Sequence, residues 1–155
     1  MPEFKIGVNA TSNATPDTED AFIELLSANP SIVRVKRFRI ACQTAAQDAR
    51  LQWRLLRTTT AGATGTGGTV VKKKPGTRAS GVTANVKNGT AAFTVGTVGD
   101  IFDQGSLNAR AVYEWVPRGD EEVVEMTGDA TNRLVLAIKS SVASLVLDIF
   151  LEYKD

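Results

Sequence analysis

Residues 144–153, SLVLDIFLEY, alternate apolar side chains with a second set that is largely polar. A period of two places alternate side chains on opposite faces of a β-strand, so the stretch predicts a strand with one face against a core. Val146 and Phe150 join the second set, which predicts that the other face is partly covered too, and a partner chain could cover it. The core-facing set is Leu145, Leu147, Ile149, Leu151 and Tyr153.

Similar alternation recurs along the chain and predicts an all-β protein. Many short strands separated by turn residues are typical of an antiparallel β-sandwich or a barrel. Asn88-Gly89 predicts a hairpin between its flanking strands, because both residues tolerate positive φ. Over residues 18–26 a helical turn is the alternative to the strand that we favour. The expected strands are 3–9, 20–27, 31–43, 49–57, 68–73, 82–86, 90–95, 107–116, 122–126, 132–139 and 143–153.

The stretch from Ile32 to Cys42 changes phase in its middle. Val33 and Val35 share one parity, whereas Phe38 and Ile40 share the other. One extra residue near 36–37 would account for the change, either as a β-bulge or where a strand passes between two sheets.

The length of 155 residues predicts one domain, spanning 1–155. Residues 1–19 are a candidate extended N-terminal arm. Residues 58–69, TTTAGATGTGGT, have low complexity and lack large side chains, so we predict an exposed, flexible loop or hairpin over 58–80. No apolar run approaches the about 20 residues of a membrane-spanning helix. The first residues do not resemble a signal peptide, so synthesis in a cytoplasm is expected.

Composition argues against most catalytic chemistry. The chain has no histidine and one cysteine, Cys42. Catalytic triads, histidine-ligated zinc and zinc bound by several thiolates are therefore excluded. The carboxylates, among them Asp100 and Asp103, show no pattern that would place two of them across a cleft. We therefore expect no enzyme, no cofactor and no metal, and we expect Cys42, Trp53 and Trp115 to be core residues.

Charge is unevenly distributed, although the net charge is only +1. Residues 31–87 hold twelve Lys or Arg against Asp48 alone, while residues 1–30 and 100–129 are acidic. Such segments either present separate basic and acidic regions to different neighbours or lie side by side in the fold and neutralise each other. The sequence leaves both interpretations open.

The lysine run 72–74 is the strongest basic feature. A solvated hairpin, docking onto an acidic protein surface and contact with nucleic-acid phosphates all fit it. No aromatic residue lies between Trp53 and Phe93 to stack on bases, so we do not expect a nucleic-acid partner. The candidate contact residues for a protein partner are Arg57, Lys72, Lys73, Lys74, Arg78, Asp120, Glu121 and Glu122.

Two stretches carry a resemblance to a known class of protein. They are residues 50–69, RLQWRLLRTTTAGATGTGGT, and residues 109–125, ARAVYEWVPRGDEEVVE. An Arg-flanked strand, a Thr/Gly loop and an aromatic strand that ends in Trp-Val-Pro resemble small capsid decoration (cement) proteins of tailed bacteriophages, over about residues 31–155. The resemblance implies a jelly-roll sandwich, often trimeric, that bridges neighbouring major capsid proteins.

The expected function is thus a structural virion protein on the outer capsid surface, assembled in the host cytoplasm. Its expected partners are the major capsid protein and further copies of itself, with no membrane. The alternative is a carbohydrate- or receptor-binding β-sandwich module of a phage tail or a bacterial surface.

Overall fold

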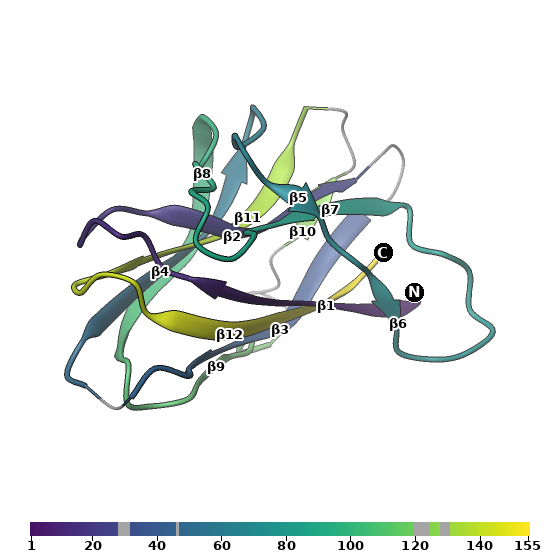
Figure 1. The fold of residues 1–155 in the computed structure, drawn as a ribbon. Helices are drawn as coiled ribbons and strands as arrows, with labels where there is room; N and C mark the ends of the chain where they lie inside the picture. Colours follow the sequence, from purple (N-terminus) through teal and green to yellow (C-terminus); the bar gives the residue numbers. More distant parts are fainter. Residues whose placement is uncertain (28–31, 46, 120–124, 128–130) are drawn as a thin grey trace.

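The computed structural model describes residues 1–27, 32–45, 47–119, 125–127 and 131–155. These residues contain strands and no helix, and so no helix that could span a membrane. Two antiparallel sheets pack face to face (Figure 1), which confirms the all-β sandwich. The strands are β1 (Glu3–Thr11), β2 (Asp20–Ser27), β3 (Ile32–Cys42), β4 (Arg50–Thr58), β5 (Thr66–Gly67), β6 (Val71–Lys72), β7 (Val82–Val86), β8 (Val98–Asn108), β9 (Tyr113–Trp115), β10 (Glu125–Thr127), β11 (Arg133–Ser140) and β12 (Val146–Lys154).

One sheet, here called sheet A, has the order β10-β3-β12-β1-β6, with β9 also paired to β3. The other, sheet B, has the order β5-β7-β2-β11-β4-β8. The N-terminal residues form β1, which pairs with β12 from Glu3↔Lys154 to Thr11↔Val146 and with β6 on its other side. The N-terminal arm expected over 1–19 is therefore not confirmed, because Glu3–Thr11 form a strand inside a sheet.

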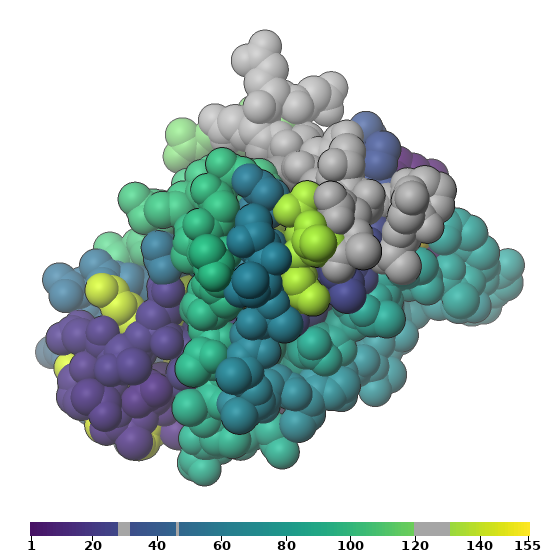
Figure 2. Space-filling view, turned by 90° about the horizontal axis from the view of Figure 1, so that it is seen from above, coloured from purple at the N-terminus to yellow at the C-terminus, as the bar shows by residue number. Residues whose placement is uncertain are grey.

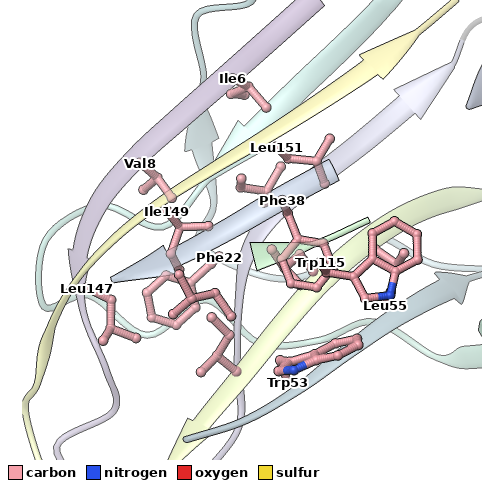
Figure 3. Packing of buried hydrophobic residues seen from close by; sticks show 14 of the residues in the cluster. Ile6, Val8, Phe22, Phe38, Trp53, Leu55, Trp115, Leu147, Ile149 and Leu151 are labelled. Atoms are coloured by element: carbon pink, nitrogen blue, oxygen red, sulfur yellow. The ribbon is translucent and has the colours of Figure 1, made fainter. Parts of the chain in front are cut away.

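The inner face of β12 is buried, as the alternation along this strand predicts. Leu147, Ile149 and Leu151 are almost fully buried, and they meet residues of sheet B between the layers (Figure 3). Phe38 lies in the same core, edge-on to Trp53 at 4.9 Å and stacked on Trp115 at 5.4 Å between ring centroids. The prediction that both tryptophans are core residues is confirmed.

The phase change in β3 is a bulge. Glu152 of β12 pairs with Arg37, but the next residue, Tyr153, pairs with Val35. Lys36 is thus the extra residue, and it returns Val35 and Phe38 to the same buried face. The strand favoured over residues 18–26 is also confirmed, as β2.

The hairpin and the strand predicted at 90–95 are wrong. β7 pairs with β2 and β5, and residues 90–95 form no strand. Gly89 does take positive φ, but the chain then crosses the outer face of sheet B, where Phe93 is fully buried. Its carbonyl accepts a hydrogen bond from the Ala21 N–H at 2.7 Å. Residues 90–95 are thus held on sheet B by the burial of the Phe93 side chain and not by pairing with a neighbouring strand.

Other strand boundaries also differ from expectation. Of the strand expected at 68–73, only Val71–Lys72 are a strand, β6, and the strand expected at 107–116 is the end of β8, a turn and β9. Most of β8 was not predicted, because it is an edge strand whose side chains are largely exposed and do not alternate. Of the strand expected at 122–126, residues 122–124 lie outside the described residues, and Glu125 begins β10.

The Gly/Thr loop is largely exposed, as predicted, but two of its glycines pack closely against the chain. A Cβ built on Gly65 would lie 2.6 Å from the Phe93 ring, and one on Gly62 would lie 2.2 Å from the Thr94 carbonyl oxygen. The loop also runs beside the segment that enters β8 (Figure 2), where the Thr59 N–H donates to the Thr97 carbonyl at 2.9 Å. Glycine is needed here for close packing on Phe93.

Substitution of two glycines of this loop tests that packing. Gly65→Ala is expected to lower the free energy of unfolding by about 1–3 kcal/mol, because the methyl group overlaps the buried ring. Gly67→Ala is the matched control, since a Cβ there meets nothing within 4 Å. Urea denaturation measures both, and equal effects would contradict the packing role.

A buried ion pair joins the start of β2 to the residue after β7. Lys87 Nζ lies 2.9 Å from Asp20 Oδ2, with side chains 0% and 2% exposed. Lys87 also donates to the Ala91 carbonyl at 2.6 Å, which holds the segment before Phe93. Asn13 Nδ2 donates to Asp20 Oδ1 at 3.3 Å. The pair therefore ties the chain that covers sheet B to the sheet itself.

Removal of one partner is expected to cost far more than removal of both. Asp20→Leu leaves the Lys87 charge buried and uncompensated, and should cost about 3–5 kcal/mol. In the double variant Asp20→Leu/Lys87→Met, most of that loss should be recovered. Urea denaturation of the three proteins gives the comparison, and an equal loss in the single and double variants would refute this account.

Candidate functional site: a basic face on sheet A

The predicted basic residues 72–78 lie together at one edge of sheet A. Lys72 ends β6, and Lys73, Lys74 and Arg78 lie in the exposed loop that follows. Within the described residues, the side chains of three of the four have intramolecular partners: Lys72 Nζ donates to the Thr77 carbonyl at 2.8 Å, Lys73 reaches Glu152, and Arg78 lies 2.8 Å from Asp155. The lysine run is thus an extension of sheet A.

Arg57 lies elsewhere. It is in β4 of sheet B, where its Nε donates to Asp100 Oδ2 at 2.5 Å and its Nη1 donates to Asn132 Oδ1 at 2.9 Å. The structure does not bring it near the lysine run. Asp120, Glu121 and Glu122, the acidic candidates, lie outside the described residues.

The fold neutralises much of the charge that the sequence segregates. Arg54 pairs with Glu19, and Arg57 pairs with Asp100, so the acidic segments that precede and follow the basic one in the sequence both reach it. Neutralisation is therefore the interpretation that the described ion pairs favour. The cations of residues 31–87 with a described carboxylate partner are Lys36, Arg37, Arg39, Arg50, Arg54, Arg57, Lys73, Arg78 and Lys87.

Glu152 is the centre of an ion-pair network on the outer face of sheet A. Its side chain is 5% exposed and accepts two hydrogen bonds from Arg37, at 2.8 and 3.0 Å, and one from Lys73 at 2.9 Å. Arg37 also contacts Glu114 at 3.0 Å, and Lys73 lies 3.6 Å from Glu3. The hydrogen bonds from Arg37, with those from Lys73, lower the pKa of Glu152 to about 2 despite its burial.

The outer face of sheet A collects further cations around Phe150. Lys5 Nζ lies 4.3 Å from the ring centroid, and the guanidinium carbons of Arg39 and Arg37 lie 4.8 and 5.3 Å from it. We call the outer face of sheet A, together with Lys73, the basic face. Its charged members are Lys5, Arg34, Lys36, Arg37, Arg39, Lys73, Lys154, Glu3, Glu114, Asp148 and Glu152.

Lys5, Arg37 and Arg39 were not among the predicted contact residues. In the sequence, the observation that pointed to this surface was Phe150, an aromatic residue on the largely polar, outward-facing side of its strand. Locating its neighbours required the pairing of β12 with β1 and β3, because Lys5 is 145 residues away in the sequence.

The carboxylates considered for catalysis have separate structural contacts. Asp100 binds Arg57, whereas Asp103 accepts a hydrogen bond from Trp115 Nε1 at 2.7 Å. Among the residues the structure describes, no group of three or more Cys, Asp or Glu could hold a metal ion. Burial, together with the charge of Asp103, raises the pKa of the Tyr113 hydroxyl.

The outer side of sheet B has two neighbouring hollows. One, of about 670 Å³, is lined by β4, β8 and the turn before β2, with Glu19 and Arg54 paired in it. The second, of about 610 Å³, shares Ser106 with it. Both tryptophan side chains are buried, so neither offers the exposed stacking surface that carbohydrate binding generally uses.

Comparison with known proteins finds nothing similar: no family model, curated protein or solved structure matches this chain. What the protein does must therefore be argued from its own residues.

The Glu152 network predicts a pH dependence. Because its folded pKa is about 2 and its reference value is 4.5, Glu152 stabilises the fold fully above pH 4.5, and this contribution is lost as pH falls through 2. Glu152→Gln should cost about 2 kcal/mol at pH 7 and progressively less below pH 4.5.

Glu114→Gln is the control for that measurement, since it removes a far more exposed partner of the same arginine and should cost at most about 1 kcal/mol. Denaturant unfolding at pH 7, 4 and 2.5 provides the data. A cost for Glu152→Gln that does not change with pH would contradict the assignment.

Proposed function

We propose that this chain is a jelly-roll structural protein of a virion, which binds the outer capsid surface and joins neighbouring major capsid proteins. The observation that carries the proposal is the strand order. With β5–β7 treated as an insertion and β9 and β10 as one broken strand, the order is β1-β12-β3-β9/β10 in sheet A and β2-β11-β4-β8 in sheet B. If these eight strands are numbered 1 to 8 along the chain, sheet A has the order 1-8-3-6 and sheet B has the order 2-7-4-5.

That order supports the proposed jelly roll, a fold in which paired strands wind around the sandwich together. Jelly rolls recur in viral capsid proteins and in lectins. A fold alone does not identify a function. The resemblance of residues 50–69 and 109–125 to phage decoration proteins favours the capsid role over the lectin role, and so does the burial of both indoles.

Attachment to a lattice needs a stiff body and one face that can be repeated around it. The sandwich supplies the body, and the basic face with residues 72–78 supplies a surface for protein contacts. Copies on a symmetric shell, as trimers in this proposal, would add their individual contacts through multivalency. Weak single contacts are therefore sufficient for stable decoration.

Reconstitution tests the proposal. The purified chain, added to capsids assembled without it, is expected to co-sediment with the particles and to raise their melting temperature in calorimetry. Capsids that already carry the chain are the control and should take up no more. Failure both to bind and to stabilise the depleted capsids would refute the virion role.

A further inference from the structure

We propose that the basic face is the docking surface of this protein, that Phe150 is its apolar anchor, and that its occupant is an acidic protein surface. The inference rests on the proposed function in one respect, because the acidic surface is assumed to belong to the capsid. The face itself is argued from the geometry below.

Phe150 is an aromatic residue on the outer side of a central strand. It lies in β12, with β1 and β3 as its neighbours at Gly7 and Arg39. A Cβ on Gly7 would meet only the Ile149 carbonyl oxygen, at 3.7 Å, so the position beside the ring is open. The ring is only partly buried, and a partner side chain can reach it above Gly7. Aromatic residues in such central positions contribute strongly to protein interfaces.

The two outer faces of the sandwich differ in how their apolar residues are covered. On sheet B, Leu56, Val135 and Ala137 pack beneath Phe93, and the chain itself closes over them. On sheet A, Val71 is 57% exposed beside Lys5, and Val112 and Val116, which flank β9, are 67% and 53% exposed. Apolar side chains thus remain in water at two edges of the basic face, with Phe150 between them.

Charge specifies the partner. The basic face has seven cations and four carboxylates whose side chains are described, and Glu125 of β10 pairs with Arg34 at its edge, which leaves an excess of two positive charges. Lys5 has no carboxylate partner among the described residues, although it lies directly over the anchor ring. A partner carboxylate beside Phe150 would pair with Lys5 and lose little in desolvation at this partly exposed site. An acidic surface with an apolar centre therefore complements the face.

The exposed lysine loop extends this surface beyond the sheet. β6 pairs with β1 at Lys5↔Val71, and Lys74, three residues beyond Val71, is exposed. The predicted lysine run therefore continues the basic surface that Lys5, Arg37 and Arg39 form, whereas Arg57 is not part of it. Long-range attraction by such a surface speeds association with an acidic partner and weakens with salt.

Charge reversal at Lys5 tests the docking surface. Two probes are used at low salt: capsids assembled without this chain, and immobilised poly-L-glutamate, which presents carboxylates without any capsid. Lys5→Glu is expected to weaken binding to both by about fivefold or more. Lys139→Glu, the same reversal on the outer face of sheet B, is the matched control and should leave binding within twofold.

Phe150→Thr separates the anchor from the charge. It should weaken binding to capsids by about tenfold or more, because the apolar contact is lost, and should affect poly-L-glutamate little. Thermal unfolding of each variant establishes that the fold persists. If a variant does not fold, the wild-type chain bound to capsids is acetylated instead. Protection of Lys5 from acetylation then shows whether the basic face contacts the capsid.

The outcomes separate the two proposals. If the wild type binds neither probe, or if Lys5→Glu and Lys139→Glu behave alike on both, the docking surface is wrong. If poly-L-glutamate binding depends on Lys5 but no capsid binds, the virion role fails and the acidic-partner surface stands. If capsids bind with Lys5 unprotected, the virion role stands and the surface is wrong. Tighter binding to duplex DNA than to poly-L-glutamate would overturn the choice of a protein partner.

Discussion

The pairing of β12 between β1 and β3 is the constraint on which the rest of the structure depends. The last strand of the chain is bonded along both edges, to the first strand for nine residues and to β3 through the bulge at Lys36. Its inner face supplies the centre of the core, and its outer face supplies Phe150 and Glu152. Sheet A can therefore form only when residues from both ends of the chain have met.

The same pairing explains the charges. Glu152 is adjacent to Arg37 because β12 lies against β3, and Glu3 reaches Lys36 and Lys73 from β1. A segment that is strongly basic in sequence is thus largely neutralised by acidic residues from elsewhere in the chain. On the outer face of sheet A, Lys5 lies over an aromatic ring without a carboxylate partner among the described residues, and this gives the proposed docking surface its chemical character.

The Gly/Thr loop shows how composition can mislead. Its small residues predict a flexible segment, and most of them are exposed. Two of its glycines nevertheless lie against Phe93, which no pattern around residue 93 identifies as buried. Together with the ion pair between Lys87 and Asp20, this packing closes the outer side of sheet B. The contrast with sheet A, whose outer aromatic residue is covered mainly by cations, exists only in three dimensions.

The sequence by itself determined the all-β class, the inner face of β12 and the position of an irregularity in β3, because alternation and its interruption are local properties of the chain. Only the tertiary structure decided that Phe93 is covered, that β8 is an edge strand, and that Arg57 lies apart from Lys72–Lys74. It also decided which charges cancel and that Lys5 and Arg39 meet at Phe150. These features depend on which distant segments become neighbours, and long-range pairing leaves no periodic signal in either segment.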